Sequence, residues 1–203
     1  MIKKQDCMNV KVEGHIRIWE KETGKVLLDQ HNAIHPENMS AALSFCLSAL
    51  SNPTEYQKEC LEWICFGNGG ARATSSNKYI YATPQTMGRS ATLYHQTYKK
   101  NIGSGHDENN YISVTHVSGN LYTDIMVNCL LGMDEPSDQE LTNVQSGNGD
   151  ITAQYTFSEI GLMTKGNGED TNNKLLTHLT FYPVLKASNT ALQIQYLIRV
   201  QVV

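Results

Sequence analysis

The segment from residue 192 to residue 202 constrains the fold more than any other part of the chain. Its even positions are apolar: Leu192, Ile194, Tyr196, Ile198, Val200 and Val202. Its intervening positions are mostly polar: Gln193, Gln195, Arg199 and Gln201. A period of two gives an extended segment one apolar face and one polar face. The sequence therefore predicts a half-buried strand that ties the end of the chain into a sheet.

Several other segments have the same period or the composition of a short buried strand. They are residues 10–18, 26–28, 61–66, 121–131, 151–157 and 175–185. Residues 21–25 form a predicted turn whose Gly24 suits a positive φ, so the first two strands are expected to make a hairpin. Asn148-Gly149 and residues 165–170 are further predicted turns, and Pro183 indicates an edge strand or a bulge.

One segment has helical spacing instead. Pro36 suits the first turn of a helix, and Glu37 complements the positive end of the helix dipole. The apolar stripe consists of Met39, Leu43, Cys46, Leu47 and Leu50. Because Ser51-Asn52-Pro53 ends this pattern, we expect one helix with one face packed on the sheet.

Residues 71–110 show no sustained period and are rich in Ser, Thr, Asn, Gly and Tyr. The exceptions are a short predicted strand at 79–81 and a predicted helix at 89–100. A segment this long without regular structure is uncommon unless it makes contacts, so we interpret it as an extended contact arm. Residues 1–203 are thus expected to form a single, mainly β domain. It would be an antiparallel β-sandwich or barrel-like, with one packed α-helix and a long irregular excursion.

Charge and composition limit the partners. Sixteen Lys and Arg against twenty Asp and Glu leave a net charge of -4, which disfavours nucleic-acid binding. The sequence contains no run of about 18 apolar residues, so no membrane-spanning helix is expected. Met1 to Cys7 lead into no apolar stretch, and we expect synthesis in the cytoplasm. The five scattered cysteines favour neither a disulfide framework nor a zinc site, and most are interpreted as small buried residues.

Three patterns in the sequence have features of ligand sites. Gly67 to Gly70 lack the Lys-Ser or Lys-Thr of a phosphate loop, so a tight turn after a strand is preferred. Gly166 to Asp170 lack the alternating carboxylates of a calcium loop. His31 and His35 have a metal-ligand spacing, but Pro36 disfavours helical geometry at His35. We therefore assign no metal-binding or cofactor-binding residue and expect no cofactor.

Candidate catalytic groups are few. His106-Asp107-Glu108 and His178 are candidates to orient Ser104 or Ser113, but the sequence has no G-x-S-x-G elbow. Glu159 lies where strand parity shifts before Ile160-Gly161, which a bulge explains without catalysis. A hydrolase of cell-wall or surface polymers would require Asp107, Glu108 and Glu159 to converge. We assign no catalytic residue and do not expect an enzyme.

The aromatic residues allow a second interpretation. Ten tyrosines with Trp19 and Trp63 are typical of cores and interfaces, although exposed rings also stack on sugars. The alternative function is therefore a carbohydrate-binding or host-recognition module of a phage tail, with Tyr94 and Tyr98 as candidate contacts.

Several patches resemble a known group of proteins. Residues 14–19, 23–27 and 31–35 with the following helix resemble the opening of small virion structural proteins of tailed bacteriophages. Residues 64–70, 157–162, 176–184 and 196–200 are similar to further segments of that group, whereas residues 71–110 match none. The resemblance implies a virion subunit of the tail, neck or baseplate that binds copies of itself in a ring and docks other virion proteins. Weak surface charge and open sheet edges suit such assembly.

Overall fold

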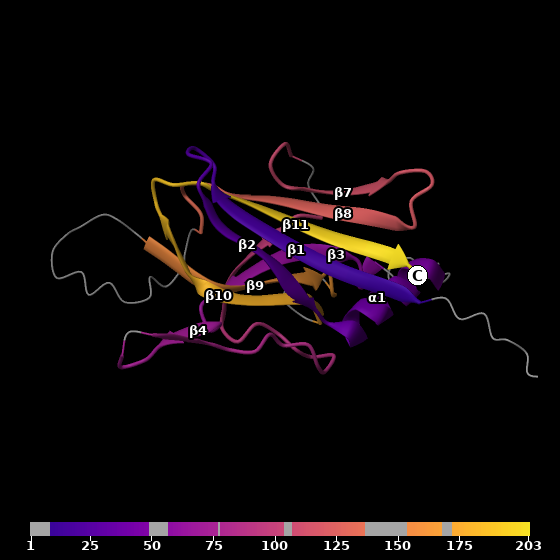
Figure 1. Ribbon diagram of the computed structural model, residues 1–203, viewed down its shortest axis with the longest axis horizontal. Coiled ribbons are helices and arrows are strands. Elements are labelled where there is room, and N and C mark those ends of the chain that lie inside the picture. Colours follow the sequence, from indigo (N-terminus) through magenta and orange to yellow (C-terminus); the bar gives the residue numbers. More distant parts are fainter. Residues whose placement is uncertain (1–8, 49–56, 77, 104–106, 137–153, 168–171) are drawn as a thin grey trace, which may run out of the picture.

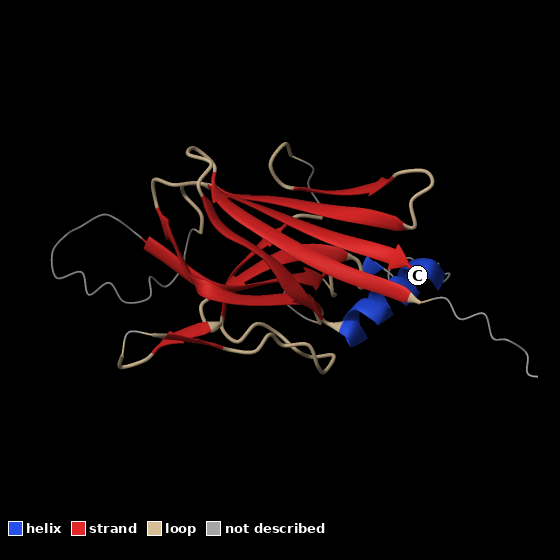
Figure 2. Ribbon diagram, viewed as in Figure 1, coloured by secondary structure: helices blue, strands red, loops and turns tan. Residues whose placement is uncertain are grey.

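The computed structural model describes residues 9–48, 57–76, 78–103, 107–136, 154–167 and 172–203. This part of the chain is mainly β-sheet, with a helix at one end of the sheet (Figure 2). The helix is α1 (Pro36–Ser48). The strands are β1 (Val10–Glu20), β2 (Val26–Ile34), β3 (Leu61–Gly67), β4 (Ala71–Ala73), β5 (Tyr79–Tyr81), β6 (Gln96–Asn101), β7 (Tyr111–His116), β8 (Tyr122–Leu131), β9 (Gln154–Thr164), β10 (Leu175–Ala187) and β11 (Leu192–Val202).

Nine strands form one antiparallel sheet in the order β6-β3-β9-β10-β2-β1-β11-β8-β7, and β4 pairs with β5 separately. The large sheet curls into a half-barrel (Figure 1). Side chains from both halves of the curl fill the main core, for example Ile16, Ile194 and Cys129 from one half and Phe66 and Phe157 from the other. The expectation of a mainly β, barrel-like fold is confirmed.

The C-terminal strand lies inside the sheet. β11 pairs with β1 from Val10↔Val202 to Glu20↔Leu192, and with β8 on its other side. Its buried residues are the apolar ones at even positions from Leu192 to Ile198. The hairpin between β1 and β2 is also confirmed, with Gly24 at a φ of 70° in its turn.

The two halves of the sheet are joined by β2 and β10, which pair only at Thr177↔Ile34 and His178↔Ala33. Beyond these pairs the two strands separate. The pairing of β10 with β9 shifts register between Thr180 and Val184, so the bulge predicted from Pro183 is confirmed.

Helix α1 starts at Pro36, as predicted. The carbonyl oxygen of His35 accepts from Met39 N at 2.9 Å, and its ring Nδ1 accepts from Asn38 N at 3.3 Å. His35 therefore caps the helix. The predicted stripe is only partly correct, because Met39 is buried whereas Cys46 and Leu47 are exposed. Leu50 lies outside the described residues.

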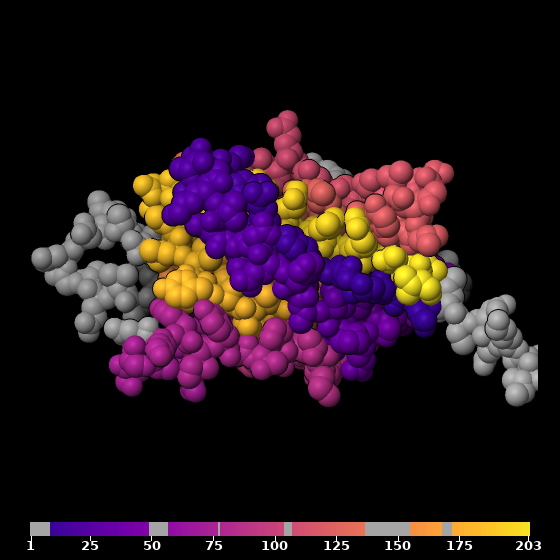
Figure 3. Space-filling model, in the orientation of Figure 1, coloured from indigo at the N-terminus to yellow at the C-terminus, as the bar shows by residue number. Residues whose placement is uncertain are grey.

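The described part of the arm, residues 71–110, contains the three strands β4, β5 and β6. β5 confirms the predicted strand at 79–81. The predicted helix at 89–100 is wrong, because residues 96–101 form β6 and pair with β3 from Trp63↔Asn101 to Gly67↔Gln96. Pairing with a distant strand overrides weak local preference in this segment. The hairpin of β4 and β5 lies against β10 (Figure 3).

Candidate functional site

The most distinctive polar site is a carboxylate buried under the arm. Glu159 lies on β9 and its side chain is fully buried. Its Oε1 accepts from Gly69 N at 3.0 Å and from His95 N at 2.8 Å. Its Oε2 accepts from Tyr94 N at 2.9 Å and faces His178 Nε2 at 3.1 Å. We call these five residues the Glu159 cluster.

The hydrogen bonds fix the tautomer of His178. Its Nδ1 lies 2.7 Å from Gln85 N, and a backbone amide can only donate. Nδ1 is therefore an acceptor without a proton, and the ring proton is on Nε2, from which it is donated to Glu159. The imidazole is neutral, so the Glu159 charge is balanced by four N–H donors and not by a cation.

The cluster holds the arm against the sheet. Glu159 binds the chain where it leaves β3 and again where it approaches β6, and His178 binds Gln85 between these points. Three more side chains continue the attachment. Ser158 Oγ accepts from Ala71 N at 3.1 Å, Thr180 Oγ1 donates to Ala82 O at 2.7 Å, and His35 Nε2 lies 3.1 Å from Gly88 O. Much of the arm is thus attached to β9, β10 and the start of α1.

Close approach of the arm explains the glycines after β3. A Cβ on Gly69 would lie 2.7 Å from Tyr94 Cβ and 3.0 Å from Glu159 Oε1. A Cβ on Gly70 would collide with the carbonyl oxygen of Ser158. Neither glycine has a positive φ, so both are needed here for contact distance. The predicted loop after β3 is present, and its glycines are explained by close contacts that could not be predicted from the sequence.

Gly161 has a similar explanation. A Cβ there would lie 2.6 Å from Thr177 O and 2.8 Å from Leu175 Cδ1. The parity shift predicted at Glu159 is real, because Phe157 and Ile160 both belong to the main core. The register shift across from these residues lies on β10, between Thr180 and Val184.

The geometry of the Glu159 cluster suits holding the arm in place better than transferring a proton. Both ring nitrogens of His178 are engaged, and both carboxylate oxygens of Glu159 accept two hydrogen bonds each. Burial by itself would raise the pKa of Glu159, but the hydrogen bonds from His178, His95, Tyr94 and Gly69 outweigh burial and lower that pKa below the ordinary value of 4.5. Glu159 is therefore a stable anion at neutral pH.

This lowered pKa predicts acid sensitivity. An unfolded chain takes up a proton at Glu159 near pH 4.5, at a pH where the folded protein still keeps it ionised. Its contribution to stability is complete above pH 4.5 and is lost as the pH falls through the lower pKa of the folded state. We expect the urea midpoint to fall more steeply with acid in the wild type than in Glu159→Gln. Asp107, Asp124 and Glu135 also have lowered pKa values and make both proteins sensitive to acid. If the urea midpoints of the two proteins fell in parallel with pH, Glu159 would add nothing to this sensitivity and the assignment would be contradicted.

The other catalytic candidates do not belong to the Glu159 cluster. Asp107 is exposed and accepts from Asn109 N and Asn110 N, and Glu108 is exposed as well. Among the described residues these carboxylates share no hydrogen-bond partner with Glu159. Ser113 lies on β7, and Ser104 and His106 lie outside the described residues.

The residues that the sequence suggested as ligand sites also have different partners in the structure. His31 Nδ1 lies 3.2 Å from Gly14 O, whereas His35 caps α1 and contacts the arm. Gly166 has a φ of 66° in a turn, and residues 168–171 are not described. In the described ranges no group of three or more His, Cys, Asp and Glu side chains is arranged to hold a metal ion. The helix in this part of the chain is also too short to cross a bilayer.

The aromatic candidates have different surroundings. Tyr94 is about half exposed and its hydroxyl donates to Thr83 O at 2.7 Å. Tyr98 is half-buried, with its hydroxyl 3.2 Å from Glu135 Oε1 and its ring 6.0 Å from Phe66. Arg17 lies over Trp19 at 5.6 Å, and Lys99 lies over Trp63 at 4.0 Å.

Sequence reasoning missed the attachment residues Ser158, Thr180, His35 and His178 in this role. For Ser158, Thr180 and His178 the only local signal is polarity inside otherwise apolar strands, and His35 lies just after a strand. The backbone groups that these four residues bind lie 53 to 98 residues away in the sequence. Comparison with protein-family models, with curated proteins and with solved structures finds no match for this chain.

Proposed function

We propose that this chain is a structural subunit of a bacteriophage virion, in the tail, neck or baseplate, and that it works by self-association and by docking neighbouring virion proteins. The sequence patches that resemble such proteins include residues 64–70 and 157–162. In the structure these two patches meet, because β3 pairs with β9 from Leu61↔Thr164 to Gly67↔Glu159. The resemblance thus covers a contiguous structural unit, which supports a common role.

The observation that carries self-association is an exposed apolar patch at one end of the sheet. It consists of Val10, Leu121, Val202 and Val203, and we call it the end patch. Val202 pairs with Val10 and its amide donates to Leu121 O, so these residues are neighbours. Leu121 is 70% exposed and Val203 is 57% exposed. Contiguous exposed apolar surface is typical of protein interfaces.

A second surface supports docking of a neighbour. Where β2 and β10 separate, a groove of about 530 Å³ opens between them. Leu27 and Leu28 line one side, and Tyr182 and Leu185 line the other. Two strands with unpaired edges facing a groove can accept an extended segment by β-strand addition. The groove and the end patch give the subunit two different surfaces, as ring assemblies require.

We expect the purified protein to self-associate in sedimentation velocity, and Leu121→Asp to shift it toward the monomer. Met87→Asp is the matched control, since Met87 is a more exposed apolar residue in the arm. Mass spectrometry of purified particles from the source organism should find the chain. A monomer at all concentrations together with absence from particles would overturn the proposal, and equal effects of both substitutions would remove the end patch as its basis.

A further inference from the structure

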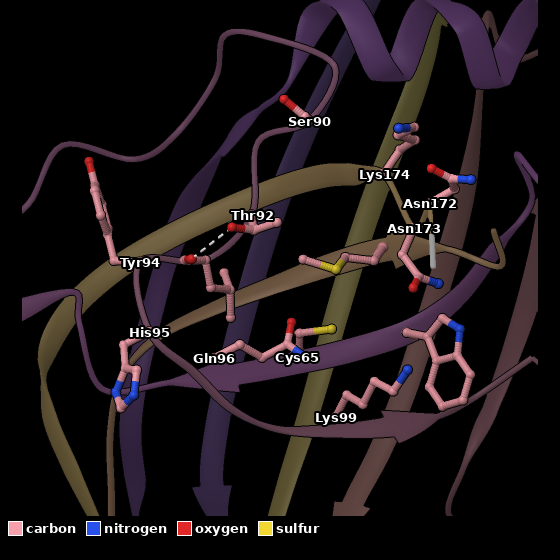
Figure 4. A pocket seen from close by; sticks show the side chains of 13 residues that line it. Cys65, Ser90, Thr92, Tyr94, His95, Gln96, Lys99, Asn172, Asn173 and Lys174 are labelled. Atoms are coloured by element: carbon pink, nitrogen blue, oxygen red, sulfur yellow. Dashed lines mark hydrogen bonds between the residues drawn. The ribbon is translucent and has the colours of Figure 1, made fainter. Parts of the chain in front are cut away.

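A pocket of about 500 Å³ lies between the arm and the outer face of β3 and β9 (Figure 4). Its apolar wall consists of Cys65, Leu93 and Met163, which belong to a small core separate from the main one. The volume is within the usual range for small-ligand sites, which is about 300 to 1,000 Å³. The Glu159 cluster fixes one side of this pocket, since Tyr94 and His95 also line it.

Five neutral hydrogen-bonding side chains line the pocket. They are two hydroxyls from the arm, Ser90 and Thr92, and three amides, Gln96, Asn172 and Asn173. Figure 4 shows Ser90 and Thr92 on the arm above the opening and Gln96 on its lower side. Asn173 Nδ2 already donates to Thr164 O and Lys165 O, and Thr92 Oγ1 donates to Leu93 O, so these two side chains offer acceptors only. Ser90, Gln96 and Asn172 can both donate and accept, which suits a ligand with several hydroxyl groups. An apolar wall beside them suits the C–H face of a sugar ring.

The charged side chains that the structure places around the pocket are cationic. Lys99 and Lys174 line it, and among the described residues no Asp or Glu does. Lys174 makes no ion pair with any residue that the structure describes. Lys99 lies over the Trp63 ring at 4.0 Å, which fixes its ammonium beside the pocket. Such surroundings favour an anionic group on the ligand.

Trp63 adds a second, independent feature. It lines the pocket, and its buried indole Nε1 has no acceptor within the described part of the chain. A buried donor without a partner is uncommon and costs free energy until an acceptor reaches it. The nitrogen is closed to solvent in this conformation, so a bound carboxylate or hydroxyl oxygen would supply that acceptor after a small shift of the pocket wall.

We propose that this pocket binds an acidic saccharide, a hydroxyl-bearing ring with a carboxylate. The carboxylate is placed toward Lys174 and Lys99, and the ring hydroxyls toward the amides and hydroxyls of the rim. This site is separate from the end patch and the β2–β10 groove, so it does not depend on the proposed assembly role. It gives the chain a recognition function in addition to a structural one.

The test is titration calorimetry of the full chain with a galacturonic acid trimer, the matching neutral galactose trimer, and inorganic phosphate. We expect the acidic trimer to bind, with an affinity that weakens as salt is added, and the other two probes to bind at least tenfold more weakly. Equal binding of the neutral trimer, preferential binding of phosphate, or no binding of the acidic trimer at millimolar concentration would overturn the proposal.

Two variants locate the site. Lys174→Gln keeps a flexible polar side chain, one atom shorter, but removes the charge, and should weaken binding of the acidic trimer about tenfold. Trp63→Phe keeps an aromatic ring but removes the indole N–H, and should weaken it severalfold. Lys25→Gln is the control, because Lys25 lies outside this pocket and pairs with Glu20. If Lys25→Gln reduced binding as much as Lys174→Gln, the binding would be nonspecific attraction to the surface and the pocket assignment would be wrong.

Discussion

Replacing Glu159 by glutamine is expected to destabilise the protein by about 3 kcal/mol. The carboxylate accepts four N–H donors through two oxygens. Glutamine keeps one of these oxygens and puts an NH₂ group in place of the other. That NH₂ group would face two N–H donors in a fully buried position. His178 cannot relieve the conflict by exchanging its tautomer, because its Nδ1 already accepts from Gln85 N.

The loss should be located in the arm as well as in global stability. Hydrogen exchange measured by mass spectrometry should show faster exchange of the Gly69, Tyr94 and His95 amides in Glu159→Gln. Urea unfolding would give the stability change itself. Glu13→Gln is the control, since Glu13 is an exposed carboxylate on β1 paired with Lys11, and its midpoint should match the wild type. If Glu159→Gln kept wild-type stability and protection at these amides, the carboxylate would not hold the arm.

This attachment bears on both proposals. The sequence predicts that the arm is a contact segment. Such a segment binds its partner better when it is already ordered within its own subunit, because less conformational entropy is then lost on binding. The five attachments from β9, β10 and His35 provide such ordering. They also shape the saccharide pocket, whose arm side is set by the residues that Glu159 binds. Releasing the arm should therefore affect ligand binding, whereas the end patch, at the ends of the central strands β1 and β11, should be unaffected.

Most of the fold could be predicted because its strands are amphipathic. In β1, β8 and β11 one face packs on the core while the other is polar, and alternation identifies such strands directly. The segment at 96–101 failed this test, because Gln96 to Asn101 show no period of two. Its strand conformation comes from pairing with β3, about 35 residues earlier, which no local pattern records.

The Glu159 cluster could be predicted only in part. β9 is buried on both faces from Phe157 to Thr164, because the core covers one face and the arm covers the other. A polar Ser158-Glu159 pair within such a strand indicates a buried polar site. Its partners are mostly backbone amides of the arm, and every amide looks the same in a sequence. Only the three-dimensional path of the arm brings Gly69, Tyr94 and His95 together.

The largest effect is expected from Phe157→Ala, which should destabilise the protein by about 4 kcal/mol. Phe157 is fully buried on β9. Its ring lies 5.5 Å from Phe66 on β3 and 5.7 Å from Phe181 on β10, both in edge-to-face geometry, and 5.7 Å from Tyr155. These rings fill the concave side of the curled sheet across three adjacent strands. Their removal leaves a cavity that a hydrogen-bonded sheet cannot collapse to fill.

Tyr182→Ala is the matched control, because Tyr182 is next to Phe181 on β10 but points outward and is 62% exposed. Its ring contacts Tyr79 at 4.8 Å, and its loss should cost less than about 1 kcal/mol. Urea unfolding of both variants compares the two faces of the same sheet. Folded domains are stable by only about 5 to 15 kcal/mol, so Phe157→Ala removes a large share of the total. Equal costs for the two substitutions would mean that the aromatic cluster does not hold the curl, and that the half-barrel depends on strand pairing alone.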